Sequence, residues 1–228
     1  MERKLLLQNF LHLFFPRLCM ACDTHLMAAE EVICATCKFH LPLTDFHLDP
    51  SNEMARHLWG KISFEKAFSM LHLAKSSRVE SLLHRLKYKN QPEIGHFLGR
   101  WYAQSIKDVL QDVDMIVPIP IHPSKLRKRG YNQAAEFAKG LSEGLEIPLN
   151  TMLIIRKVLS VSQTEKSRTE RYENVAGVFS LLPYISDLKD VHILLVDDVL
   201  TTGATIAEAG NLLVAAGAKV SIVTFARA

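Results

Sequence analysis

Hydrophobic residues along this chain occur in two alternating patterns. Short apolar runs of the kind found in buried strands occupy residues 68–73, 115–119, 153–154, 178–182, 192–196 and 219–225. Apolar positions three and four residues apart, which are typical of helices, occupy residues 79–86, 94–101, 133–145 and 204–216. Strands that alternate with helices predict an α/β domain, which we expect from about Ser63 onward.

The first 15 residues follow a different pattern. An apolar stretch begins after Arg3 and Lys4, but Gln8, Asn9 and His12 interrupt it and no small-residue cleavage site follows. The stretch is also too short and too polar to span a bilayer. We therefore expect an amphipathic helix that ends before proline 16, and a cytoplasmic protein with no membrane span.

Composition adds little to this picture. The chain has 228 residues, of which 48% are hydrophobic and 22% charged, as in ordinary globular proteins, and its formal net charge is only +3. Charge is more informative locally, because basic residues gather in two clusters. One contains Lys125, Arg127, Lys128 and Arg129, and the other contains Arg78, Arg85, Lys87 and Lys89. Such clusters either bind phosphate or nucleic acid or simply form a solvated surface.

All four cysteines lie near the N-terminus in two Cys-x-x-Cys pairs, Cys19 with Cys22 and Cys34 with Cys37. Two such pairs separated by a short segment can place four thiolates around one Zn²⁺ ion. Four protein ligands leave no position open for water, so the site would be structural. The alternatives are two disulfides, which are unusual in the cytoplasm, or a redox Cys-x-x-Cys, which needs only one pair.

The most informative segment runs from Leu194 to Thr205. A predicted strand delivers two adjacent carboxylates, Asp197 and Asp198, into a turn that consists of Thr201, Thr202, Gly203, Ala204 and Thr205. The helix expected to start there directs its free N–H groups and positive dipole end toward the same place. Carboxylates can hold sugar hydroxyls while the turn holds a phosphate, so the segment predicts a sugar phosphate site. The alternative is a strand, turn and helix whose aspartates only cap the helix.

Two further segments carry candidate ligand-binding residues. Pro118 and Pro120 prevent the strand at 115–119 from continuing, and a basic loop that includes Lys125, Arg127 and Arg129 follows before a helix capped by Asn132. This loop could hold a pyrophosphate or be a solvated turn. Residues 163–172 predict a loop or an exposed helix. There, Arg168 and Arg171 could close over a ligand or belong to a charged surface helix.

The acid pair and its turn resemble the phosphoribosyl pyrophosphate motif of type I phosphoribosyltransferases, in which two acids precede Thr-Thr-Gly-x-Thr. Over almost its whole length the chain also resembles the ComF family of competence and DNA-utilisation proteins. The further residues that carry this resemblance are the four cysteines, Leu86 to Lys89, Pro118 to Pro120, Arg129 to Gln133, Gln163, Arg171 to Val175, and Phe179. Lys166 departs from the pattern, because many relatives would have an apolar residue there.

The resemblance implies a type I phosphoribosyltransferase fold, a parallel sheet flanked by helices, behind an N-terminal zinc-ribbon module. Residues 1–45 would form the N-terminal helix and the zinc ribbon, and residues 46–228 the phosphoribosyltransferase-like domain. Asp197 and Asp198 would bind the ribose hydroxyls, and residues 201–205 the 5′-phosphate. The loop that carries Lys125, Arg127 and Arg129 would hold the pyrophosphate with Mg²⁺.

The resemblance also implies a role in natural transformation, in which the protein handles incoming single-stranded DNA beside a helicase and a recombination mediator. Lys87 and Lys89 are then candidates for contact with the DNA backbone, and Tyr88 could stack on a base. The protein would be a phosphoribosyltransferase with an unidentified acceptor. The alternatives are a sensor or adaptor that binds phosphoribosyl pyrophosphate without turnover, and an enzyme of nucleotide salvage.

Overall fold

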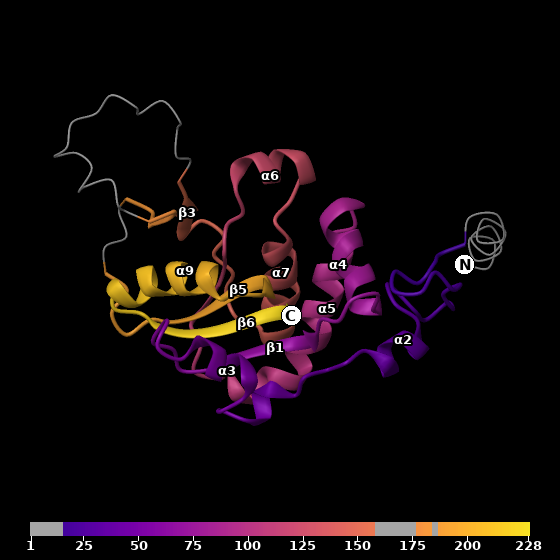
Figure 1. The fold of residues 1–228 in the computed structure, drawn as a ribbon, viewed down its shortest axis with the longest axis horizontal. Coiled ribbons are helices and arrows are strands. Elements are labelled where there is room, and N and C mark those ends of the chain that lie inside the picture. The colour runs from indigo at the N-terminus through magenta and orange to yellow at the C-terminus, as the bar shows by residue number, and fades with distance from the viewer. Residues whose placement is uncertain (1–15, 158–176, 184–186) are drawn as a thin grey trace.

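The computed structural model describes residues 16–157, 177–183 and 187–228 (Figure 1). Its strands are β1 (Ala67–His72), β2 (Met115–Pro118), β3 (Ile154–Arg156), β4 (Phe179–Leu181), β5 (His192–Leu200) and β6 (Lys219–Arg227). Its α-helices are α2 (Ala35–His40), α3 (Glu53–Leu58), α4 (Arg78–Tyr88), α5 (Glu93–Ile106), α6 (Pro123–Arg129), α7 (Gln133–Leu145) and α9 (Ala204–Ala215). Two short 3-10 helices, η1 (Phe46–Leu48) and η2 (Lys107–Val109), complete the set.

The core of the molecule is a four-stranded sheet in the order β1-β6-β5-β2, and every neighbouring pair in it is parallel. Successive residues of β5 point to opposite faces of this sheet. Leu194 and Val196 pack with the helices α5 and α7, whereas Ile193 and Leu195 pack with α3 and α9. Helices therefore cover both faces of a parallel sheet, as the sequence predicts.

The candidate site lies at the carboxyl ends of β2 and β5. Pro118 ends β2 as predicted, and the side chain of Asn132 caps α7 by accepting a hydrogen bond from the N–H of Ala134 at 3.2 Å. β5 is longer than the predicted run 192–196, since it continues to Leu200 with β6 paired alongside it up to Arg227. The two acids therefore lie within the last part of β5, not after its end.

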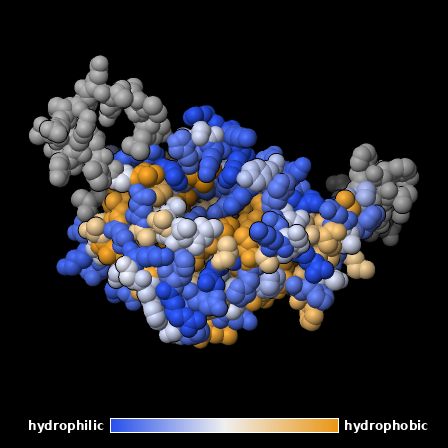
Figure 2. Space-filling view, viewed as in Figure 1, coloured by the Kyte–Doolittle hydropathy of each residue, from blue (hydrophilic) through white to orange (hydrophobic). Residues whose placement is uncertain are grey.

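The prediction of a basic loop over Lys125 to Arg129 is wrong, because these residues form the helix α6. Pro123 occupies the first turn, where its fixed φ favours a helix, and the N–H of Ser124 donates to Nδ1 of His122 at 3.2 Å. Gly130 ends the helix with a φ of +84°. In Figure 1, α6 stands above the body of the molecule, and Figure 2 shows that this part of the visible face is hydrophilic.

Strands β3 and β4 form a separate antiparallel hairpin, with Ile154 opposite Leu181. The segment that joins them contains the predicted ligand-contacting residues Arg168 and Arg171, which lie outside the described residues. The predicted N-terminal helix also lies outside them. Within the described ranges, none of the helices is both long and apolar enough to cross a membrane.

The cysteine-containing segment packs against α4 and α5. Asp23 accepts hydrogen bonds from Arg85 at 2.7 Å, and Glu31 accepts one from Arg100 at 2.6 Å. Cys19 and Cys37 belong to the same buried cluster as the core residues of α4 and α5. Residues 42–51, which follow this segment, contact the sheet, because Leu43 forms an antiparallel bridge with Leu71 of β1.

Candidate functional site

The acid pair lies near the carboxyl end of β5. Asp197 is paired in register with the buried Thr224 of β6, and both aspartates are half-buried. The backbone N–H of Asp198 donates to Oδ1 of Asp197 at 2.8 Å, so a main-chain hydrogen bond fixes the orientation of the first carboxylate. Asp197 and the turn that follows β5 line one small hollow.

Lys87 of α4 neutralises the second carboxylate. Its Nζ lies 2.9 Å from Oδ2 of Asp198, and about a fifth of each side chain is exposed (23% and 21%). The sequence suggested a contact between Lys87 and nucleic acid but offered no reason to join it to the acids. The available signal is its helical position, because Lys87 is four residues after the buried Leu83 and shares the face of α4 that packs on the domain.

The carboxyl group of Asp197 has a raised pKa. Burial, and after it the charge of Asp198, raise the pKa of Asp197 to about 7. The hydrogen bond from the Asp198 N–H and the positive charges of Lys87 and Arg156 act in the opposite direction. Arg156 was not a predicted site residue; it lies at the end of β3. Near neutral pH, therefore, a large fraction of Asp197 holds a proton and can donate a hydrogen bond.

The turn after the acids leads directly into α9. The hollow at this turn is lined by Asp197 and by the residues from Val199 to Ile206. Gly203 precedes the helix with a φ of +78°, and a Cβ atom there would lie 2.9 Å from Cδ2 of Leu58. A side chain at this position would therefore be strained by the positive φ and would have to displace the end of the Leu58 side chain of α3. The first N–H groups of α9 have no partner within the helix, which makes them available to an anion.

Helix α3 and the loop after it brace the turn in a way that the sequence did not reveal. Nζ of Lys61 donates to the carbonyl oxygen of Thr202 at 3.0 Å and lies 3.2 Å from Nε2 of His57. Lys61 is far from the turn along the chain and has no motif around it. Only the packing of α3 against the end of β5 brings the two together.

A second hollow, which we name the α4–α6 groove, lies between these two helices and has a volume of about 280 Å³. Its lining residues are Lys87, Tyr88, Asn90, Lys125, Lys128 and Arg129. The guanidinium of Arg129 lies 5.4 Å from the centre of the Tyr88 ring and donates to Oε1 of Gln133 at 2.7 Å. Of the predicted basic residues, Arg127 and Lys89 are exposed outside this lining.

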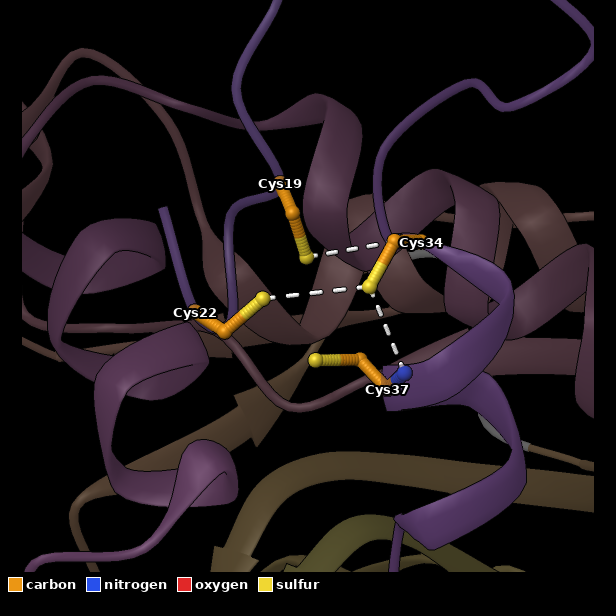
Figure 3. Close-up of side chains that lie close together, drawn as sticks. All are labelled: Cys19, Cys22, Cys34 and Cys37. Carbon is orange, nitrogen blue, oxygen red and sulfur yellow. Dashed lines mark hydrogen bonds between the residues drawn. The ribbon is translucent and has the colours of Figure 1, made fainter. Parts of the chain in front are cut away.

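The structure also brings the four cysteines together (Figure 3). Their sulfur atoms all lie within 4.8 Å of one another, and those of Cys22 and Cys34 are 3.8 Å apart. Two sulfur ligands of a tetrahedral zinc ion with bonds of about 2.3 Å lie about 3.8 Å apart, so the donor set and its spacing fit Zn²⁺. All four thiols are free, which contradicts the two-disulfide alternative in this structure.

Hydrogen bonds within the segment orient these sulfur atoms. The backbone N–H of Cys34 donates to Sγ of Cys19 at 3.3 Å, and that of Cys37 donates to Sγ of Cys34 at 3.4 Å. Burial raises the pKa of Cys19 and Cys37, whereas a hydrogen bond with the Thr24 hydroxyl is the main cause that lowers the pKa of Cys22 to about 6. The cluster therefore has one thiol that is readily deprotonated and a set of donors that can orient a bound metal's ligands.

Several known proteins are similar to this chain. Residues 84–228 match the family model described as "Phosphoribosyl transferase domain". "Competence protein F" of Haemophilus influenzae is 28% identical over 88% of this chain and 92% of its own length. "DNA utilization protein YhgH" of Escherichia coli strain K12 is 28% identical over 89% and 93%. "Competence protein ComFC" of Bacillus subtilis is 29% identical over 64% and 58%.

The family match begins within α4, before Lys87, and contains the acid pair, the turn after it and the strands β2 and β6 that flank β5. It covers more than half of the chain, and the two relatives from Haemophilus and Escherichia align with most of its length. The chain therefore belongs to the phosphoribosyl transferase domain family, and within it to the ComF branch.

Proposed function

We propose that this protein binds phosphoribosyl pyrophosphate together with Mg²⁺. The observation that carries the proposal is the hollow at the end of β5, which is lined by both the Asp197 carboxyl and the turn that opens α9. A compound that carries sugar hydroxyls and a phosphate a few bonds apart complements these two features. The family match adds support, because the matched domain includes this segment.

Each group of the ligand has a partner of suitable chemistry. The ribose hydroxyls would bind Asp197 and Asp198, and the 5′-phosphate would accept hydrogen bonds from N–H groups and hydroxyls of residues 201–205. The pyrophosphate would extend toward Lys125 and Arg129, with Arg168 and Arg171 as further candidates. Arg127 is a weaker candidate, because it does not line the α4–α6 groove.

The acids on their own are a poor magnesium site, because Asp198 is already paired with Lys87 and Asp197 has a raised pKa. Mg²⁺ commonly binds through substrate phosphates with one or two carboxylates, so it would enter with the ligand. Its chemistry there would be to neutralise the charge of the pyrophosphate as that group leaves. The protein's own contribution would be electrostatic, since the acids lie beside the position where the ribose ring becomes positive.

For the biological role, we propose DNA uptake and the handling of single-stranded DNA. The support comes from the names of the relatives, which refer to competence and to DNA utilisation. Lys87, Tyr88 and Lys89 remain candidates for contact with the strand, since Tyr88 is exposed beside the cationic residues of the groove. A helicase and a recombination mediator are the proposed partners.

Titration calorimetry with phosphoribosyl pyrophosphate, in the presence and absence of Mg²⁺, tests the binding proposal. We expect saturable binding that needs Mg²⁺ and that Asp198→Asn weakens at least tenfold. Asp108→Asn makes the same chemical change at an exposed position outside the site and should leave binding unchanged. Binding of equal strength in the Asp198→Asn variant would contradict the proposed role of the acids.

Turnover separates the enzyme from a sensor. We infer a phosphoribosyltransferase with an unidentified acceptor, so pyrophosphate should be released when the bound protein is given the right acceptor. Release with a free nucleobase would indicate nucleotide salvage, whereas release that requires an oligonucleotide would indicate an acceptor in DNA. Tight binding without release in either case would favour a sensor or adaptor.

We further propose that the cysteine cluster binds one structural Zn²⁺ ion. The support is the close grouping of the four sulfur atoms, all within 4.8 Å of one another, and the N–H groups that donate to two of them. Elemental analysis of the purified protein tests this proposal, with an expected value of one zinc per chain. Full thiol titration in a metal-free sample that keeps its native fold would contradict it.

A further inference from the structure

Lys87 is the residue that joins the acid pair to the α4–α6 groove. It lines the groove together with Lys125, Lys128 and Arg129. It also lines a neighbouring hollow of about 470 Å³ that contains Asp198 and Thr201. Its side chain is therefore placed between the proposed ribose-binding carboxylate and the groove.

The two sides of Lys87 differ in charge. On one side its amine is neutralised by Asp198 at 2.9 Å. On the groove side the ionisable residues of the lining that bear charge at neutral pH are all cationic, and Arg129 is held there by a neutral amide and an aromatic ring. If Asp198 bound another partner, the Lys87 amine would face a groove whose lining holds no carboxylate, and the other carboxylate of the neighbouring hollow, Glu80, lies about two helical turns earlier on α4.

We propose that Lys87 determines ligand specificity. In the free protein its amine pairs with Asp198. When the sugar hydroxyls of a ligand bind Asp198 in its place, the Lys87 amine pairs with an anionic group of that ligand. The proposal rests on the proposed function, in which Asp198 receives the ribose hydroxyls. A ligand that offers only hydroxyls at this carboxylate must compete with Lys87 and leaves its charge uncompensated. A ligand with a second anion near the ribose replaces the displaced carboxylate, so the ion pair favours phosphoribosyl pyrophosphate over ribose 5-phosphate.

The test compares these two compounds by calorimetry with Mg²⁺ on the wild-type protein and on Lys87→Gln. Lys87→Gln removes the positive charge that, in the wild type, competes with the sugar hydroxyls for Asp198 and then pairs with the anionic group of the ligand. We expect phosphoribosyl pyrophosphate to bind roughly 10- to 100-fold more weakly, as is typical when a hydrogen bond between charged groups is removed. Ribose 5-phosphate should bind equally well or more tightly, so the preference between the two compounds should fall.

Two further variants complete the design. Lys87→Arg keeps the positive charge and should restore part of the preference, which a merely structural role for this residue does not predict. Lys107→Gln makes the same change as Lys87→Gln at an exposed site at the end of α5, and should leave both affinities unchanged.

Equal weakening of both compounds in Lys87→Gln would mean that Lys87 only supports the local fold, and no change in either would mean that it does not meet the ligand. Failure of the wild-type protein to bind phosphoribosyl pyrophosphate is a different result, because it would overturn the proposed function itself.

Discussion

Asp197 and Asp198 are neighbours in β5, yet their carboxyl groups have different electrostatic surroundings. Lys87 compensates the charge of Asp198, whereas burial and the charge of Asp198 favour the protonated form of Asp197. The two neighbouring carboxyl groups thus differ in their surroundings, because Asp198 is paired with a cation whereas burial raises the pKa of Asp197 to about 7. The pair can accept hydrogen bonds at one position and donate or accept at the other, which suits the hydroxyls of a sugar.

This difference predicts how stability depends on pH. The pKa of Asp197 is about 7 in the folded protein, compared with an ordinary value of 3.8. Folding therefore favours the protonated form, and this carboxyl increasingly destabilises the fold as the pH rises from about 4 through about 7. Asparagine at position 197 cannot ionise. The difference in free energy of unfolding between Asp197→Asn and the wild type should therefore shift in favour of the variant by about 1–3 kcal/mol from about pH 5 to about pH 8.

Urea unfolding of both proteins at several pH values measures this difference. Asp190→Asn is a suitable control, because Asp190 lies in a turn with a φ of +63° that asparagine also tolerates. The two stability curves of wild type and Asp190→Asn should run parallel. Parallel curves for Asp197→Asn and the wild type would contradict the raised pKa.

Gly203 carries the second prediction at this scale. Gly203→Ala should cost about 1–3 kcal/mol of stability, because of the positive φ and the contact with Leu58, and should also weaken phosphoribosyl pyrophosphate binding. Gly217 lies just before β6, and Gly217→Ala introduces the same kind of strain there, with a φ of +93° and a tight contact to the backbone of Lys189. Calorimetry at a temperature where both variants are folded should find normal binding only in Gly217→Ala.

Among the elements, α4 joins the parts of the molecule. Its buried face packs on the core, Arg85 pairs with Asp23 of the cysteine-containing segment, and Lys87 pairs with Asp198. Cys19, Cys34 and Cys37 are buried in the same core cluster, and the partly buried Cys22 packs against it. Loss of a metal from the cysteines would therefore weaken the packing of α4 as well as the local loops.

This coupling predicts the effect of removing the proposed zinc ion. Cys37→Ser should lose zinc and lower the melting temperature of the whole protein in a single transition. Ala35→Ser puts the same hydroxyl side chain at an exposed position of the same short helix, α2, and should behave like the wild type. Calorimetric scans of the two variants, with and without a strong chelator, measure this effect. A separate low-temperature transition in Cys37→Ser would show that the segment unfolds independently of the domain.

The whole molecule shows how far the sequence could predict the structure. Buried apolar runs and amphipathic spacing placed the parallel strands and the long helices, because these signals are local to each element. The acid pair and the glycine turn were predictable for the same reason. The helix α6 was missed, because a run of basic residues has no apolar period, and its structure depends on Pro123, the His122 cap and Gly130.

Contacts between segments far apart in the chain could not be predicted from these local patterns. Lys87 meets Asp198, and Lys61 meets Thr202, only after the helices have packed on the sheet. The four cysteines are an exception, since their regular spacing revealed their grouping before any fold was known. Long-range pairs of single charged residues carry no comparable signature in one sequence.

At the same scale, the groove predicts how single-stranded DNA would bind. The double variant Lys125→Gln with Lys128→Gln should bind an oligonucleotide more weakly and with a smaller dependence on salt, by about one unit of slope for each phosphate that the variant no longer neutralises. Lys139→Gln lies on α7 outside the groove lining and serves as the control. Fluorescence anisotropy over a range of salt concentrations measures these slopes. Unchanged slopes in the double variant would place the DNA elsewhere.

A crystal structure with phosphoribosyl pyrophosphate and Mg²⁺ tests the central claim most directly. The account predicts ribose hydroxyls within hydrogen-bonding distance of Asp197 and Asp198, and the 5′-phosphate at the N–H groups of the turn around Gly203. A fully occupied ligand bound elsewhere, with both carboxylates left in their free arrangement, would contradict it.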